Sequence, residues 1–337
     1  MSANITAEPK QASIPLSVRL LGTVSSPIIV ALALATILTA GYLFGDFQTG
    51  HLQRVLDGTE DSLGTRATAT LFVLIAYVPL AHLFLCRWTQ QHLAALRASF
   101  GAVITFERSA PAGIGAGILG AAIFLSLFIV IPILFAGSPE MSFEFIAATV
   151  AGTAFGWLAG RFSACMVRDA LRMSALARAL PTLDLFDLEP LSPIVQQGLK
   201  SALLVVMIPV LSSHLSVAPG NRVVGAAAYL LIWCALTLVA FTLPAKGVNE
   251  RILSEKRSQL RAIRSEIRGA KEQVVDQRSE ATGNRLSALL DLEVRLERVR
   301  EWPYDASNWR RFGLYILLGL GSWVGAATVE RLLNLAF

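Results

Sequence analysis

The sequence predicts an all-α polytopic membrane protein with seven transmembrane helices and a cytoplasmic, coiled-coil-like helical hairpin between the sixth and the seventh. Its 337 residues are 54% hydrophobic and 16% charged, with a mean hydropathy of +0.57, which is unlike a soluble domain. Seven long stretches are almost free of charge, whereas the segment 245–311 holds 15 of the 29 Lys and Arg residues. This pattern excludes a soluble enzyme and a disordered polymer.

Each predicted span is long enough to cross a bilayer, which takes roughly 20 apolar residues at ~1.5 Å per residue. Runs such as Ile118–Phe135 are apolar on every face, which indicates helices and not the alternating strands of a barrel. Glu144, at the edge of the fourth span, is the only formal charge inside any of them, and the fifth span is the shortest. The predicted spans are Leu20–Phe44, Ala67–Cys86, Ala112–Ala136, Phe143–Gly160, Ser201–Val217, Val223–Pro244 and Phe312–Val329.

The distribution of Lys and Arg predicts a cytoplasmic N-terminus, because positively charged loops stay in the cytoplasm. In this orientation only Arg54, Arg66, Arg222 and Arg331 lie outside, against 25 inside, or ten inside when the long loop is left out. The expected location is the inner (cytoplasmic) membrane, with the C-terminus outside. The first hydrophobic run exceeds the roughly 7–15 residues of a signal-peptide core, so we expect an uncleaved anchor in preference to a cleaved signal.

The hairpin is predicted from apolar residues that recur every seven positions, which is a heptad stripe. Thr282-Gly283-Asn284 is the strongest turn signal, and a second stripe starts at Leu289. The first helix of the hairpin is longer than the second, so part of its apolar stripe needs another partner. That partner is either the rest of this chain or, in the second interpretation, another copy or a cytoplasmic protein. The heptad positions are Leu253, Leu260, Ile267 and Val274.

The chain is expected to divide into four parts. Residues 1–19 form a cytoplasmic tail, and 20–244 a six-helix membrane region with amphipathic cytoplasmic loops. Residues 245–311 form the hairpin and an interfacial anchor, in which Trp302-Pro303-Tyr304 and two arginines suit the headgroup layer. Residues 312–337 form the seventh helix and a short tail.

Glycines at helical spacing predict close helix packing, because a missing side chain lets another backbone approach. Whether these contacts lie within one chain or between chains stays open. The packing candidates are Gly152, Gly156 and Gly160 in the fourth span and Gly321 and Gly325 in the seventh.

A polar pathway is predicted near the prolines of the spans, since Pro79, Pro132 and Pro209 each free a backbone carbonyl. Proton-coupled carriers usually keep a carboxylate near mid-membrane, and none is present. Ion-coupled transport by a single chain is therefore disfavoured, although a pore between subunits needs no buried charge. The pathway candidates are Tyr77, His82, Ser212, Ser213 and His214.

A basic amphipathic extension follows the fourth span, where Arg161, Arg168 and Arg172 fall on one helical face. The plainer interpretation is a helix lying at the lipid surface that keeps its charge inside. The functional one is contact with an anionic lipid headgroup.

Motifs for catalysis are missing from the sequence: it has no P-loop, no H-E-x-x-H, no paired Cys-x-x-Cys and no G-x-S-x-G. We therefore expect no catalytic, cofactor or metal site, and no nucleic-acid partner. The first functional hypothesis is an oligomeric channel or permease-like protein, a homo-oligomer whose subunits meet through the surplus heptad stripe of the hairpin. The alternative is a non-transporting scaffold or sensor whose hairpin docks a partner, and an intramembrane enzyme ranks last.

Overall fold

The structure is a computed structural model, and in its described part the chain forms nine α-helices, one π-helical turn and one 3₁₀ turn. The N-terminal tail and the start of the first predicted span lie outside the described residues. So does His214. The residues described are 26–59, 63–101, 114–130, 133, 142–180, 183–213, 222–277 and 280–336.

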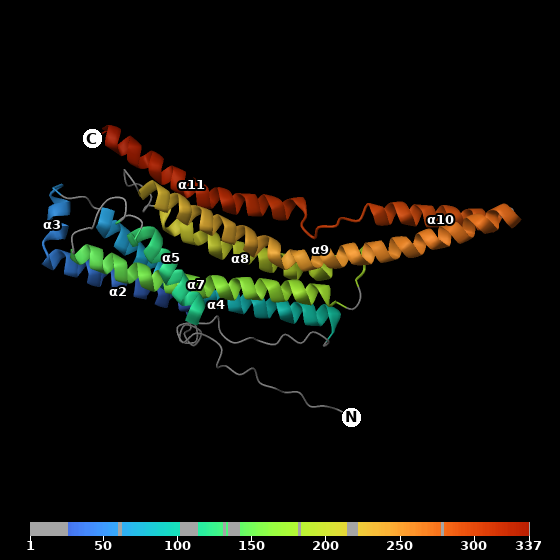
Figure 1. Cartoon of the computed structure of the whole chain (residues 1–337), viewed down its shortest axis with the longest axis horizontal. Coiled ribbons are helices and arrows are strands. Elements are labelled where there is room, and N and C mark those ends of the chain that lie inside the picture. Colours follow the sequence, from blue (N-terminus) through green and yellow to red (C-terminus); the bar gives the residue numbers. More distant parts are fainter. Residues whose placement is uncertain are drawn as a thin grey trace, which may run out of the picture.

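Five helices are long and apolar enough to cross a membrane, so the chain is a multi-pass helical membrane protein. They correspond to the first, second, fourth, fifth and sixth predicted spans and run side by side as a bundle (Figure 1). They are α2 (Pro27–Gln48), α4 (Leu63–Phe100), α7 (Phe143–Arg178), α8 (Ser192–Leu211) and α9 (Arg222–Gln277).

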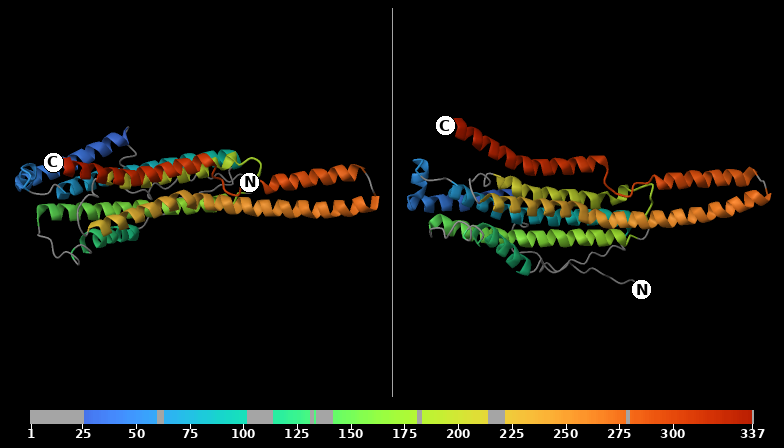
Figure 2. Two further views of the ribbon diagram at one scale, coloured as in Figure 1. Left: turned by 90° about the horizontal axis from the view of Figure 1, so that it is seen from above. Right: turned by 45° about the horizontal axis from the view of Figure 1, so that its top comes forward.

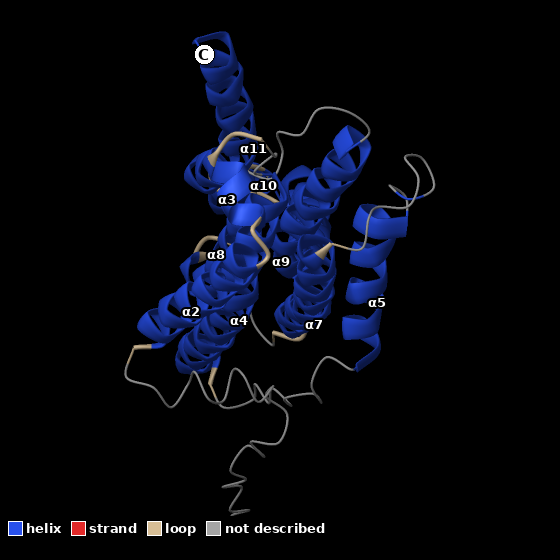
Figure 3. Ribbon diagram, turned by 90° about the vertical axis from the view of Figure 1, so that its left-hand side faces the viewer, coloured by secondary structure: helices blue, strands red, loops and turns tan. Residues whose placement is uncertain are grey.

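Two further helices correspond to the third and seventh predicted spans and are not among these five. The third is represented by α5 (Ile114–Leu125) and a π-helical turn at Ser126–Val130, which together form a shorter apolar helix. The seventh is represented by α11 (Ala306–Ala336). Viewed from the α3 end, α5 lies beside α7 at one side of the bundle (Figure 3).

Three of the five long apolar helices are much longer than a bilayer is thick. At ~1.5 Å per residue, the 38 residues of α4, the 36 of α7 and the 56 of α9 reach about 57, 54 and 84 Å, against about 30 Å of hydrocarbon. Each therefore continues from the apolar bundle into the region beyond it. The predicted surface-lying extension after the fourth span is thus the straight end of α7, packed against α4 and α9.

The long helices build two successive cores. The first lies in the apolar bundle around Leu74, Phe162 and Ile208. The second joins the far ends of α4 and α7 to the middle of α9, where Val248 and Ile252 are buried. Leu296 of α10 (Glu280–Glu297) completes this second core. The first part of the heptad stripe of α9 therefore packs against other segments of the same chain.

The remainder of α9 is paired with α10, which returns antiparallel beside it (Figure 2). Arg264 of α9 forms ion pairs with Glu293 and Glu297 at 2.6 and 2.8 Å. The Lys256 ammonium donates to the carbonyls of Glu297 and Val299, which satisfies the last turn of α10. We call α9 from Lys256 onward, together with α10, the arm.

The predicted turn at Thr282-Gly283-Asn284 is wrong, because these residues are helical and α10 already begins at Glu280. Helix α9 ends at Gln277. Glycine and asparagine favour turns only weakly against a helix that packs along a neighbour.

The glycines of α7 face α5 within the same chain. A side chain at Gly160 would collide with the carbonyl of Ala116, and one at Gly156 would lie 2.7 Å from the carbonyl of Gly120. One at Gly152 would strike the ring of Phe124. In α11, by contrast, an added Cβ at Gly321 or Gly325 would meet no described atom within 4 Å, whereas one at Gly319 would approach Val206 at 3.2 Å.

The segment that returns to the bundle packs around Phe241 of α9. Tyr304 stacks on that ring at 4.2 Å, and Phe312 stacks on it at 4.0 Å. The Tyr304 hydroxyl donates to the carbonyl of Phe241, three residues before Pro244 inside the helix. The predicted interfacial aromatics therefore also brace α9 where its proline interrupts the hydrogen-bond ladder.

The contact between α5 and α7 predicts a sharp dependence on Gly160. Gly160→Ala should lower the free energy of unfolding by about 1–3 kcal/mol, since both backbones must move apart. Gly115→Ala is the matched control, because an added Cβ there meets nothing within 4 Å. Thermal unfolding of the two purified variants checks this expectation, and equal midpoints would contradict it.

Candidate functional site

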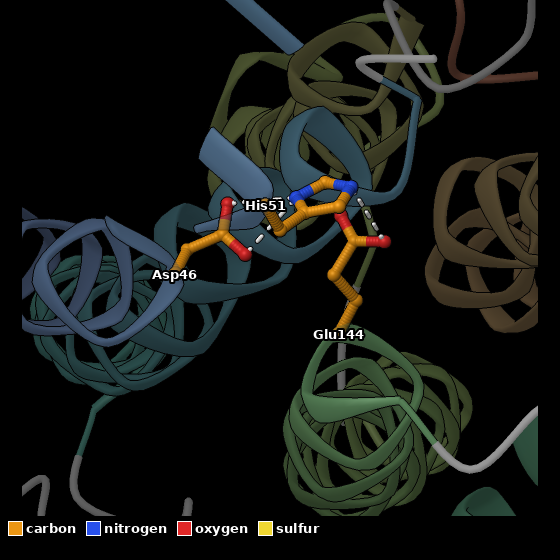
Figure 4. Close-up of side chains that lie close together, drawn as sticks. All are labelled: Asp46, His51 and Glu144. Carbon is orange, nitrogen blue, oxygen red and sulfur yellow. Dashed lines mark hydrogen bonds and ion pairs between the residues drawn. The ribbon is translucent and has the colours of Figure 1, made fainter. Parts of the chain in front are cut away.

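Charged side chains converge at the end of the bundle where α2 ends and α4 and α7 begin. Asp46 lies in the last turn of α2, and His51 is the first residue of the short helix α3 (His51–Leu56). Glu144 lies in the first turn of α7. Figure 4 shows the His51 ring between the two carboxylates. We call these three residues the Asp–His–Glu cluster.

The imidazole of His51 bridges the two acids. Its Nδ1 lies 3.1 Å from Asp46, and its Nε2 lies 3.3 Å from an oxygen of Glu144. The Thr65 hydroxyl of α4 lies within hydrogen-bond distance of both carboxylates, at 3.3 Å from Asp46 and 3.1 Å from Glu144. Four elements of the chain thus meet at one polar point.

Two glycines make this convergence possible. Gly50 has φ of +72°, a conformation that side chains disfavour. It reverses the chain so that His51 returns to Asp46, and the Thr49 hydroxyl reinforces the turn by donating to the Asp46 carbonyl. Gly64 of α4 leaves room for the acid, because a Cβ there would lie 2.8 Å from Glu144 Oε1.

The electrostatic setting favours a cation in this cluster. Asp46 is fully buried, whereas the side chains of His51 and Glu144 are 13% and 20% exposed. A buried carboxylate is costly unless it is paired. Asp46 also lies at the C-terminal end of α2, where the helix dipole disfavours negative charge, whereas Glu144 benefits from the N-terminal end of α7.

Aromatic rings close the cluster on its membrane side. Tyr42, one turn before Asp46 in α2, stacks with Phe143 at 5.9 Å and lies 6.0 Å from Phe72. Phe143 also fills the space beside Gly45, where a Cβ would be 2.7 Å from the ring. The polar groups therefore rest on an apolar floor that limits solvent access.

This donor set has defined chemistry. One imidazole nitrogen and one oxygen from each carboxylate lie within 4.8 Å of one another. Such a set can hold a proton on the ring between two acids, or it can coordinate a metal ion.

No protein family, curated protein or solved structure was found to match this chain. The geometry of its own side chains is therefore the basis for assigning it a function.

Sequence reasoning missed the Asp–His–Glu cluster and expected no metal site. It marked only Glu144, as a charge at a span edge. Asp46 and His51 just beyond the first span were the available signal, but their proximity to Glu144 depends on how three separate helices pack.

The described residues of the predicted polar pathway bond to, or pack against, other groups of the bundle. The Tyr77 hydroxyl donates to the carbonyl of Leu204 at 2.8 Å. Ser212 bonds to the carbonyl of Ile208 at 3.0 Å and to the Tyr229 hydroxyl at 3.1 Å. His82 is buried edge-on to Phe162. Ser213 is the last described residue before the gap at 214–221, and it also interacts with other groups.

A second polar seam, also missed from sequence, joins α4 to α8. The Gln197 amide donates to the Thr89 hydroxyl at 2.9 Å, and the Lys200 ammonium lies 3.3 Å from His92 Nε2. Lys200 also lies 5.4 Å from the centroid of Trp88. Gln197 and Lys200 precede the predicted fifth span, which starts at Ser201, whereas α8 already begins at Ser192.

The three arginines proposed to contact lipid are half-buried along α7. The Nε of Arg161 is buried and has no hydrogen-bond partner among the described residues. Arg168 and Arg172 both take part in further interactions of the structure. Their apolar neighbours Met166 and Met173 belong to the two cores.

The turn before His51 generates a prediction. Gly50→Ala should reduce the free energy of unfolding by about 1–2 kcal/mol, because an alanine is strained at positive φ. Gly41→Ala, in the interior of α2 with nothing within 4 Å of the added Cβ, should be neutral or stabilising. Thermal unfolding of both variants provides the measurement, and a harmless Gly50→Ala would show that the turn is not constrained.

Proposed function

We propose that this chain is a non-transporting scaffold or sensor of the inner membrane, which docks a cytoplasmic protein on its arm. The proposal depends on two exposed apolar side chains of α10. Leu290 and Val294 are 45% and 47% exposed and lie one turn apart on the same helical face. Similar exposure in the spans is expected of side chains that face lipid, but the arm extends beyond the bundle (Figure 1).

The rest of the arm surface supports a water-exposed position. Its helices are rich in charge, and on α9 a hollow is lined by Arg257, Arg261, Arg264 and Leu260. An amphipathic acidic segment fits such a surface, because its apolar side can meet α10 and its carboxylates can meet arginine. A second copy of the chain, as in a homo-oligomer, is the competing occupant.

The arm is connected directly to the membrane core. Helix α9 runs without interruption from Arg222 to Gln277, so docking at its tip acts on a helix that also belongs to the bundle. The channel or permease hypothesis receives less support, because the described pathway candidates lie at separate levels and bond to neighbouring groups. The proposal assigns no catalytic step to the chain.

The proposed topology has seven spans. It adds α5 with its continuation, and α11, to the five long apolar helices. The N-terminus and the arm then lie in the cytoplasm, while the Asp–His–Glu cluster and the C-terminus lie outside. Arg161, Arg168 and Arg172 fall near the cytoplasmic headgroups, where contact with anionic lipid remains part of the proposal.

Thiol labelling tests the topology. After Cys86→Ala, Cys165→Ala and Cys234→Ala, a membrane-impermeant reagent should label Asp57→Cys in intact cells, and should label Ser287→Cys only in inverted vesicles. Both positions are exposed. Labelling of both from the same side would contradict the proposed arrangement.

Photo-crosslinking tests docking. A photoreactive residue at Leu290 should form a discrete protein adduct in intact cells, whereas one at Leu231, 70% exposed in the bundle, should react with lipid. The Leu290→Gln and Val294→Gln double variant, probed from Ser287, should lose the adduct. It should change the free energy of unfolding by less than about 0.5 kcal/mol, because neither side chain is buried.

The mass of the adduct distinguishes the occupants. A mass of twice the chain identifies a second copy, and a larger or smaller discrete mass identifies another protein. Ala288→Gln, an exposed change on the same helix, is the matched control and should keep the adduct. Reaction with lipid alone at Leu290, or no adduct at all, would overturn the docking proposal.

A further inference from the structure

We propose that Asp46, His51 and Glu144 form a binding site for a divalent transition-metal ion of the zinc type. A neutral imidazole nitrogen and carboxylate oxygens are ligands that Zn²⁺ accepts. Three protein ligands with a remaining open position are typical of zinc sites that also bind water or a further ligand. This inference does not depend on the docking function of the arm.

The distances suit a small ion. With zinc bonds of about 2.0–2.1 Å, the donors at the corners of a tetrahedron lie about 3.3 Å apart. The His51 nitrogens lie 3.1 Å from Asp46 and 3.3 Å from Glu144. To place one nitrogen and both carboxylates around a single ion, the ring has to turn between the acids. His51 is the first residue of the six-residue helix α3, next to the Gly50 turn, so only a short helix has to adjust when the ring turns.

The charge of the cluster also favours a cation. Within the cluster, two carboxylates face one imidazole ring. A divalent ion balances both, and its binding leaves the ring neutral and releases any second ring proton to water. Because Asp46 is fully buried at the C-terminal end of α2, its charge gains most from such an ion.

A buried polar atom in the cluster provides a second observation. The Oδ1 atom of Asp46 is buried without a hydrogen-bond partner among the described residues and has only its ion pair with His51. Tyr42 lies close enough to Asp46 and Glu144 to interact with their charges. Buried unsatisfied groups are uncommon and call for a ligand or water. A metal ion supplies the missing partner of Asp46.

The surrounding residues hold the acids in place. The Thr65 hydroxyl lies 3.3 Å from Asp46 and 3.1 Å from Glu144, the arrangement of an outer-shell group that orients metal ligands. Gly64 lets the Glu144 carboxylate lie against the backbone of α4. Thr65 and Gly64 are therefore positioning residues of the proposed site.

Calorimetric titration of the purified full-length chain with Zn²⁺ tests the proposal. One ion per chain should bind. His51→Gln and Asp46→Asn should each weaken binding by at least about tenfold, and Gly64→Ala should weaken it less, because it displaces a ligand without removing one. Asp57→Asn is the matched control, since it removes an exposed carboxylate near the cluster and should leave the affinity unchanged.

Co²⁺ provides a second measurement that needs no variant. Bound to the wild-type chain, it should give the intense visible absorption of a four-coordinate site with a nitrogen ligand, and Zn²⁺ should remove that absorption. The proposal is overturned if the wild-type chain binds no Zn²⁺, or if His51→Gln binds as tightly as Asp57→Asn. Equal affinity for Mg²⁺ would likewise overturn it, because it would indicate carboxylate binding without the histidine.

Discussion

Helix length is the constraint on which the structure depends. A bilayer accommodates only part of α4, α7 and α9, so the remainder of each helix has to find partners in another environment. It does so by building a second core directly on the first, with Val248 and Ile252 of α9 at its centre. Membrane region and arm are consequently joined by helices and not by flexible linkers.

The polar side chains of the bundle satisfy their hydrogen bonds within the chain. In lipid, an unsatisfied donor is costly, and threonines meet this requirement by bonding to their own helix. Thr70 donates to the carbonyl of Arg66, and Thr237 donates to that of Trp233. Hydroxyls used in this way stabilise the spans and are less available to a permeating solute.

Hydropathy was sufficient to predict the helical class and the five long spans, because burial in lipid is a property of each segment by itself. It could not predict the Asp–His–Glu cluster, whose members come from α2, α3 and α7. Nor could it predict the contacts of Gln197 and Lys200 with α4, since both residues precede the apolar run that starts at Ser201, whereas α8 begins at Ser192. The misplaced turn has a similar origin, because packing along α9 outweighs the local preference of Gly283.

The aromatic cluster around Phe241 has a mechanical consequence. Helix α9 is continuous from the bundle into the arm, so a sideways load at the tip of the arm bends it most readily at the turn that contains Pro244. Tyr304 and Phe312 stack on Phe241 beside that turn. They therefore stiffen the junction between the bundle and the arm.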